Sequence, residues 1–148
     1  MKTIIALRGK GGSGKTTTIR ILYELLMLEK NNFSVLTSNY KKKKGDFKAI
    51  LSKNDMLIGI TSSGDTHDLV YKALSEFNDA GCYICICACR TKDMEFPNGT
   101  NGAISKFKNY TTEFIKKTLG TTSITKNISN QSDAQLILNT IEKLVLSN

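Results

Sequence analysis

The sequence predicts a single α/β domain in which helices flank a mainly parallel sheet. Three observations carry this prediction. Apolar segments of strand length alternate with segments whose apolar residues follow helical spacing. A chain of 148 residues is long enough for one core and too short for two ordinary domains. No internal repeat is visible. Residues 1–148 are therefore expected to form one three-layer domain.

The first half of the chain predicts strands, a helix and a hairpin. The opening strand is apolar and β-branched, and glycines end it. The helix that follows has leucines and isoleucines along a broad arc. Asn54 and Asp55 lie between two apolar stretches, which favours a hairpin. The expected elements are a strand at 2–7, a helix at 14–30, a strand at 33–38 and hairpin strands at 47–51 and 56–61.

The second half predicts three helices separated by two strands. Gly81 ends the first helix and Gly120 the second. Ser132 and Gln135 form a capping box for the last one. The loop at 90–102 holds the only proline and is long enough to act as a lid. The expected elements are helices at 66–79 and 103–119, strands at 82–88 and 122–128, and a final helix from Ser132.

Composition favours acidic partners and an intracellular protein. The formal charge is +8, from 21 Lys+Arg against 13 Asp+Glu, which suits nucleotides and nucleic acid alike. Residues 41–44, four lysines, are expected to be a solvated turn, with a DNA or RNA partner as the alternative. No secretory signal and no apolar run of about 20 residues is present. A cytoplasmic protein without a membrane partner is expected.

The four cysteines are expected to be buried, reduced thiols. On a strand Cys85, Cys87 and Cys89 share one face and Cys82 lies on the other. Neighbours two apart on a strand are poorly placed to form disulfides. The C-x-x-C pairs of a structural zinc site are missing. Redox or metal chemistry is the alternative.

Residues 8–18, RGKGGSGKTTT, contain a phosphate-binding loop motif. Gly9, Gly14, Lys15 and Thr16 fit G-x-x-x-x-G-K-[ST], with a predicted strand before them and a helix after them. Glycine reaches the backbone angles that turn N–H groups towards a polyphosphate, and the helix N-terminus favours the same anion. The predicted nucleotide-binding residues are Gly9, Lys10, Gly11, Gly12, Ser13, Gly14, Lys15, Thr16 and Thr17. A glycine-rich turn that binds nothing is the alternative.

Within this loop, three side chains have distinct expected roles. Lys15 is expected to reach the terminal phosphates and act in catalysis, the Thr16 hydroxyl to hold Mg²⁺, and Thr17 to face the first phosphate.

With these residues the chain resembles the P-loop NTPase superfamily. The resemblance implies ATP or another nucleoside triphosphate, with Mg²⁺, as ligands. The form KGGSGKT, residues 10–16, is also similar to the loop of the partition and septum-site ATPases over about 20 residues. In that group an extra lysine, here Lys10, reaches across a homodimer to the partner's nucleotide. Lys10 is accordingly a candidate catalytic residue and the nucleotide-dependent homodimer a candidate assembly. A solvated loop lysine is the other reading.

A broader likeness covers residues 57–92. LIGITSSGDT followed, after a helix, by ICACRTK is similar to small bacterial and phage P-loop proteins of unassigned function. This resemblance implies the fold and ATP binding, and implies no activity.

The other half of the site is expected at the carboxyl edge of the sheet, where open α/β sheets bind ligands. Asp65 is the candidate Mg²⁺ carboxylate, and capping of the next helix by Asp65 or Thr66 is its alternative. Arg90 is the candidate for neutralising the transferred phosphoryl group or an acidic second substrate, or else an ordinary loop cation. Asp93 and Glu95 are candidate bases. His67 is expected to be a surface residue.

Three functions are compatible with these features. The first is Mg²⁺-dependent binding and hydrolysis of a nucleoside triphosphate, with ATP favoured. The second is a small-molecule or nucleotide kinase, supported by compact size and Arg90. The third is a nucleic-acid-associated module regulated by nucleotide.

Overall fold

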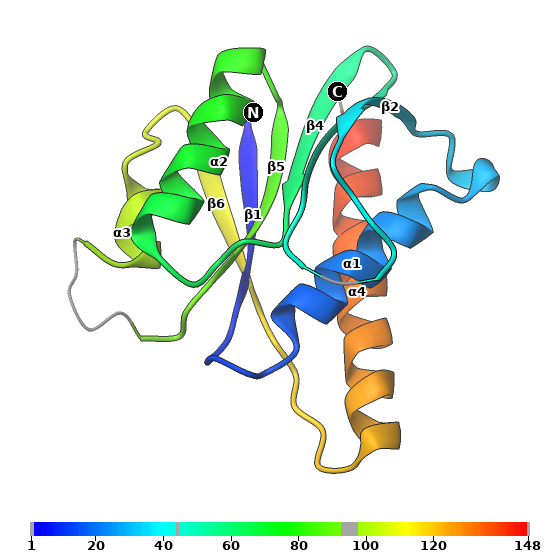
Figure 1. Cartoon of the computed structure of the whole chain (residues 1–148). Helices are drawn as coiled ribbons and strands as arrows, with labels where there is room; N and C mark the ends of the chain where they lie inside the picture. Colours follow the sequence, from blue (N-terminus) through cyan, green and yellow to red (C-terminus); the bar gives the residue numbers. More distant parts are fainter. Residues whose placement is uncertain (1, 44, 93–97, 148) are drawn as a thin grey trace.

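The protein forms one six-stranded sheet with helices on both faces (Figure 1). The computed structural model describes residues 2–43, 45–92 and 98–147. In chain order the elements are β1 (Thr3–Arg8), α1 (Lys15–Leu26), a short 3₁₀ turn (Glu29–Asn31), β2 (Ser34–Ser38), β3 (Lys48–Lys53), β4 (Met56–Thr61), α2 (His67–Ala80), β5 (Ile84–Cys89), α3 (Thr100–Ser105), β6 (Thr111–Lys116) and α4 (Ser123–Leu146).

The strand order is β2-β3-β4-β5-β1-β6. β1 pairs in parallel with both β5 and β6, and β4 pairs in parallel with β5. The hairpin adds the antiparallel pairs β2–β3 and β3–β4. All six residues of β5 are buried and five of the six in β1 are buried, because helices cover both faces of the sheet. The α/β prediction is confirmed.

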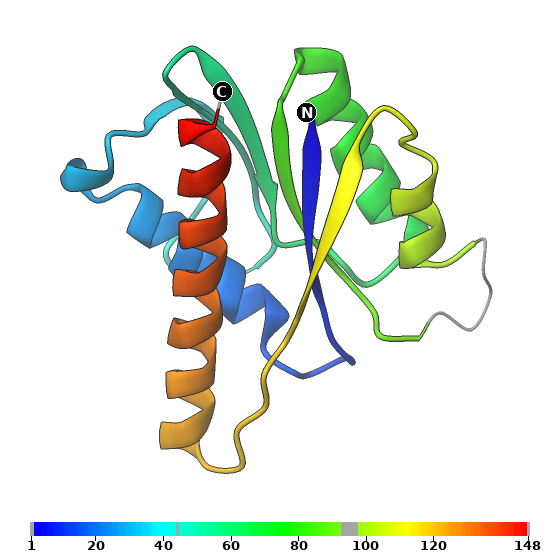
Figure 2. The same cartoon turned by 180° about the vertical axis from the view of Figure 1, so that it is seen from behind.

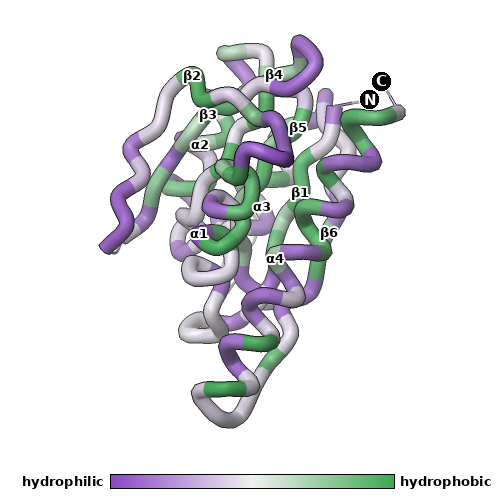
Figure 3. Tube along the Cα trace, turned by 90° about the vertical axis from the view of Figure 1, so that its right-hand side faces the viewer, coloured by the Kyte–Doolittle hydropathy of each residue, from purple (hydrophilic) through white to green (hydrophobic). Residues whose placement is uncertain are grey.

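Two helices cover each face of the sheet. α1 and α4 pack together on one side, and α2 and α3 on the other (Figures 1 and 2). A separate apolar cluster lies under each pair. Figure 3 shows hydrophobic segments concentrated along the strands, with further ones at the N-terminal end of α4. That end extends beyond the carboxyl edge of the sheet (Figure 2), and consequently Ile124 and Ile128 are 73% and 60% exposed.

The sequence predicted most elements up to β5 correctly. The hairpin turn is at Asn54 and Asp55, whose φ angles of 52° and 64° are the positive values that a two-residue hairpin turn requires. The helices predicted at 14–30 and 66–79 and the strands predicted at 2–7, 33–38 and 82–88 are present with shifted ends.

The helix predicted at 103–119 is wrong. This segment contains the short helix α3 and then β6, a strand that pairs with β1. Phe107, Phe114 and Ile115 mimic helical spacing, but Phe107 belongs to the α2–α3 side and Ile115 to the α1–α4 side. Thr111, Thr112 and Ile115 are β-branched residues that suit the strand.

The strand predicted at 122–128 and the helix start predicted at Ser132 are also wrong. α4 begins at Ser123, so that Ser132 lies inside it. The N-cap is Thr122, whose side chain accepts a hydrogen bond from the N–H of Thr125, while the Thr125 hydroxyl accepts one from the N–H of Thr122. This reciprocal pair does the work of a capping box with threonine in place of Glu or Gln.

The four cysteines are free and buried, as predicted. Cys82 precedes β5 and packs in the same cluster as the other three, so its predicted placement on the opposite face is wrong. Burial raises the pKa of Cys82 to about 11 and that of Cys85 to about 12. Within the described ranges, no helix combines the length and apolar character needed to cross a membrane.

Candidate functional site

The loop between β1 and α1 has the backbone of an anion site. Gly12 and Gly14 have φ angles of +75° and +95°, a region that side chains rarely adopt. Gly14 is the N-cap of α1, and no side chain caps the helix. No side chain at the cap therefore accepts a hydrogen bond from the first-turn N–H groups of α1. These groups and the positive end of the helix dipole face the loop.

Lys15 lies inside this loop. Its side-chain ammonium donates to the carbonyl oxygens of Gly9 (2.8 Å) and Lys10 (2.9 Å), and the residue is 7% exposed. The Lys10 carbonyl also accepts from the Ser13 hydroxyl (2.7 Å). Burial, and next the nearby Arg90 guanidinium, lower the pKa of Lys15. The two carbonyls thus hold the Lys15 ammonium within the loop.

A cavity of about 340 Å³ joins the loop to the end of β4. Thr16 and Asp65 both line it, although 49 residues separate them in sequence. A hydroxyl and a carboxylate are hard oxygen donors of the kind that Mg²⁺ takes together with waters. The residues present therefore fit a magnesium ion. The full lining is Gly12, Gly14, Lys15, Thr16, Thr17, Ser62, Gly64 and Asp65.

Asp65 does not cap α2. The cap is Thr66, whose hydroxyl accepts from the N–H of Leu69 at 3.3 Å. Asp65 instead pairs with Arg90, with 3.2 Å between Oδ1 and Nη2, and its side chain is 63% exposed. Arg90 also approaches the phosphate loop, because a Cβ placed on Gly11 would lie 2.8 Å from its Nη1. Arg90 thus links the loop with the predicted magnesium carboxylate.

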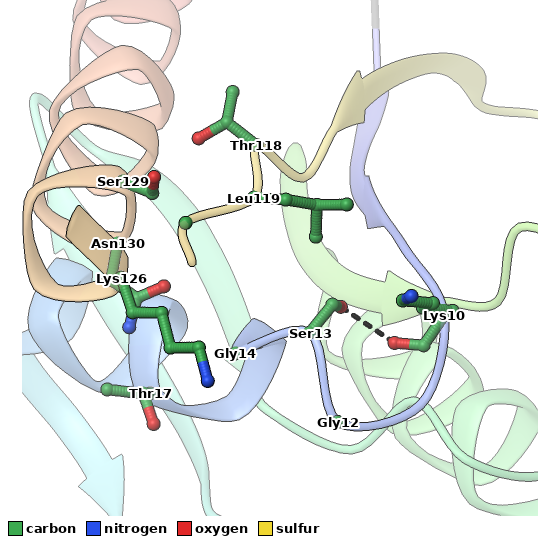
Figure 4. A pocket seen from close by; sticks show the side chains of 11 residues that line it. Lys10, Gly12, Ser13, Gly14, Thr17, Thr118, Leu119, Lys126, Ser129 and Asn130 are labelled. Carbon is green, nitrogen blue, oxygen red and sulfur yellow. Dashed lines mark hydrogen bonds between the residues drawn. The ribbon is translucent and has the colours of Figure 1, made fainter. Parts of the chain in front are cut away.

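A second cavity, of about 450 Å³, lies on the other side of the loop, between the loop and α4 (Figure 4). Lys10, Ser13, Gly14 and Thr17 line it from the loop. The opposite wall consists of residues that the sequence analysis did not identify: Thr118, Leu119, Gly120, Lys126, Ser129 and Asn130. This cavity offers amide, hydroxyl and ammonium groups within reach of a ligand whose phosphates occupy the loop.

Asn130 ties α4 to the phosphate loop. Its Oδ1 accepts a hydrogen bond from the Thr18 hydroxyl at 3.2 Å and would lie 2.7 Å from a Cβ on Gly14. A side chain at Gly14 would therefore be excluded both by the positive φ and by this contact.

A buried ion pair fixes the segment that follows β6. The Lys117 ammonium lies 2.9 Å from Oδ2 of Asp133, and the two side chains are 0% and 3% exposed. The same Oδ2 accepts from the backbone N–H and the hydroxyl of Thr118, each at 2.9 Å. The backbone N–H of Lys117 donates to the carbonyl of Arg8 at 2.7 Å. These contacts hold Thr118 and the following residues at the mouth of the second cavity.

The remaining candidates do not join the site. His67 is in the first turn of α2, where it contacts Asp68 and Lys106 and stacks on Tyr71, and it does not line the loop cavities. Lys41, Lys42 and Lys43 are exposed. Asp93 and Glu95 lie outside the described residues. Within the described ranges no group of three or more His, Cys, Asp or Glu side chains is arranged to hold a metal ion.

Local sequence carried only a weak signal for the second cavity. Thr118–Gly120 and the first turns of α4 come together only because β6 pairs with β1. The available clue was Gly120 after a β-branched segment, and the helical spacing of the aromatic residues obscured it.

Comparisons with known proteins add no family to these observations. No family model, curated protein or solved structure matches the chain.

Proposed function

We propose that this protein binds a magnesium nucleoside triphosphate, with ATP the favoured nucleotide, and hydrolyses it. One observation carries the proposal. Lys15, Thr16 and the uncapped start of α1 face the same cavity as the Asp65 carboxylate. A cavity with a cationic wall and one carboxylate suits a triphosphate and its metal.

The residues have separate roles in this proposal. In hydrolysis, the oxygen of a water molecule bonds to the γ-phosphorus, the bond from the γ-phosphorus to the bridging oxygen breaks, and a diphosphate and inorganic phosphate form. Lys15 offsets the negative charge of the phosphoryl oxygens. Thr16 and Asp65 would hold Mg²⁺, which would supply positive charge to offset the charge of the phosphate oxygens. The cavity beside Asn130 accepts the nucleoside.

Arg90 must release Asp65 for this arrangement to form. An exposed Asp–Arg pair contributes little stability, so the exchange of Arg90 for Mg²⁺ is inexpensive. Once free, the Arg90 guanidinium lies beside Gly11 and can meet charge on the transferred group.

Phosphoryl transfer to a bound acceptor is the second candidate function. The observation that favours it is a cavity of about 380 Å³ beside the loop, which Lys10 and Arg90 both line. An acceptor bound there would replace water as the nucleophile.

A nucleotide-dependent homodimer is the assembly that the loop's resemblance suggests. Lys10 is exposed and its side chain makes no ion pair within the described part of the chain. It can therefore extend towards a second copy.

The proposal is tested by thermal shift with ATP, GTP and their diphosphates, with and without Mg²⁺. A ligand at 100 times its Kd adds about 2.7 kcal/mol, which for a chain of this size raises Tm by roughly 5–10 °C. Lys15→Ala is expected to abolish this shift and keep the fold, because the side chain lies in the loop and not in the core. Lys30→Ala, an exposed lysine, is the matched control. Equal shifts for wild type and Lys15→Ala would contradict the proposal.

A further inference from the structure

The third cavity next to the loop is lined mainly by cations. It has a volume of about 380 Å³, and its cationic lining residues are Arg8, Lys10, Arg90, Lys92, Lys116 and Lys117, of which Lys117 is paired with Asp133. None of the carboxylates in the described ranges lines it. It shares no lining residue with the cavity that holds Thr16 and Asp65. We call it the cationic cleft.

Strand pairing brings these charges together. In the sheet, Arg8 at the end of β1 is opposite Lys116 at the end of β6 and Cys89 at the end of β5, and Arg90 directly follows Cys89. Like charges on adjacent strands repel each other and destabilise a sheet. A bound anion would remove that repulsion, and the carboxyl edge is where sheets of this kind take their ligands.

Most of these cations are not neutralised by the protein. The four ion pairs among the described residues include Arg90 but not Arg8, Lys10, Lys92 or Lys116. Arg8 donates to Oδ1 of Asn101 at 2.7 Å and stacks 3.6 Å above the Phe114 ring, which fixes the guanidinium plane. Its Nε is buried without a hydrogen-bond partner in the described structure.

The cleft has the size and walls for a small organic molecule. Its volume lies within the usual range for ligand pockets. Most of its lining surface is apolar, to which Leu119 and the aliphatic stems of the lysines can contribute, and a smaller part is polar. Guanidinium groups match the paired oxygens of a phosphate group, and several cations together favour a dianion.

From this arrangement we propose that the cationic cleft binds a small organic phosphate monoester beside the phosphate loop. The ester's phosphate lies among Arg8, Arg90, Lys92 and Lys116, and its organic part lies against Leu119. This inference deepens the transfer alternative by naming the acceptor class. Only the idea that the bound ester accepts a phosphoryl group rests on the proposed function. Binding of the ester in the cleft can be tested without nucleotide.

Phenyl phosphate is the probe, titrated by calorimetry into protein saturated with Mg²⁺ and ADP. Lys92→Ala and Lys116→Ala are each expected to weaken its binding by about fivefold, the loss of one partly exposed charge contact. Lys108→Ala removes the same charge at the opposite edge of the sheet, before β6, and is expected to bind normally. The proposal would be overturned if Lys92→Ala and Lys116→Ala bound phenyl phosphate as tightly as Lys108→Ala does. It would also be overturned if uncharged benzyl alcohol bound as tightly as phenyl phosphate.

A second titration separates this inference from the nucleotide proposal. Lys15→Ala without nucleotide is expected to bind phenyl phosphate as the wild type does, because Lys15 does not line the cleft. If binding is lost in Lys15→Ala and nucleotide displaces the probe, phenyl phosphate occupies the phosphate loop and the cleft assignment fails. A third outcome is that no nucleotide binds, phenyl phosphate binds, and Lys116→Ala weakens the binding of phenyl phosphate. In that case the nucleotide proposal fails and the cleft assignment is supported.

Discussion

The Asp65 carboxylate is not used to cap α2. Its position directly before a helix is equally suited to capping and to metal binding. Because Thr66 supplies the cap, the Asp65 carboxylate is available to Arg90 and, in the proposed function, to Mg²⁺. The structure thus assigns the cap to Thr66, and metal binding by Asp65 stays a prediction.

Asp65→Asn is expected to leave thermal stability nearly unchanged, because an exposed ion pair is worth about 0–1 kcal/mol. The Mg²⁺-dependent part of nucleotide binding should fall, since an amide oxygen is a weaker ligand than a carboxylate. Calorimetry with ATP, with and without Mg²⁺, measures that difference. Thr66→Ala is the control, with the opposite pattern: lost stability of about 1 kcal/mol for the missing cap and unchanged Mg²⁺ dependence. Unchanged Mg²⁺ dependence in Asp65→Asn would remove Asp65 from the metal site.

Lys15 gives the site a pH dependence. Because its pKa is lowered from 10.5, the folded protein loses this proton at a lower pH than the unfolded chain does. The unfolded state binds more protons in that window, so the contribution of Lys15 to stability without nucleotide rises with pH until 10.5. Phosphate binding has the opposite dependence, because it needs the charged form.

ATP affinity is therefore expected to fall as pH rises through the lowered pKa of Lys15, below the ordinary lysine value of 10.5. Calorimetric titrations from neutral to alkaline pH measure this loss. Lys15→Arg keeps its charge throughout that range, so any residual binding it shows should be flat with pH. A wild-type affinity that stays constant up to 10.5 would show that Lys15 does not bind the phosphates through its charge.

At the scale of elements, the junction of β6 and α4 determines the shape of the site. The Lys117–Asp133 pair joins the end of the strand to the middle of the helix, and Thr118 is bonded to the same carboxylate. Gly9 packs against Lys117, because a Cβ on Gly9 would lie 2.9 Å from the Cβ of Lys117. The buried pair thus positions the segment that lines the second cavity next to the loop.

Asp133→Asn is expected to reduce the free energy of unfolding by about 3–5 kcal/mol, because it leaves the Lys117 charge buried without its partner. Thr118→Val is the milder variant and removes one hydrogen bond, worth about 1 kcal/mol. In both variants ATP should lose affinity, while inorganic tripolyphosphate, which needs only the loop, should bind as before. Asp79→Asn, an exposed residue on α2, is the matched control. Equal losses for ATP and tripolyphosphate would show that the pair does not position the nucleoside cavity.

At the scale of the whole molecule, charge and exposed apolar groups meet at the carboxyl edge. Ile124 and Ile128, at the projecting end of α4, and Leu119, which precedes the helix, are 60–73% exposed. Leu119 also lines the second cavity together with Lys10. The net charge of +8 opposes self-association. A triphosphate bound at each site would lower that charge.

Sizing with light scattering tests the homodimer. In the presence of Mg²⁺ and ATP the wild type is expected to double its molar mass, and Lys10→Ala is expected to remain a monomer. Lys108→Ala, which removes an equal charge far from the loop, should behave as the wild type does. A wild type that stays monomeric at saturating nucleotide would exclude the homodimer.

Features that depend on local chemistry were predictable from the sequence. The motif that predicts a phosphate loop is one continuous segment, so its glycines, Lys15 and Thr16 are identified from spacing alone, and their role stays a prediction. The hairpin at Asn54 and Asp55 and the buried strand β5 follow from turn chemistry and an unbroken apolar run.

Which distant residues share a cavity depends on the three-dimensional packing of the strands and helices. β6 is a strand because it pairs with β1, and local spacing of Phe114 and Ile115 could not show that. The approach of Arg90 to Asp65 depends on the pairing of β4 with β5, and that of Arg8 to Lys116 on the pairing of β1 with β6. The approach of Asn130 to Gly14 depends on how α4 packs against α1. The physical reason is that strand pairing and burial are non-local: the free energy that selects them comes from contacts between segments far apart in the chain.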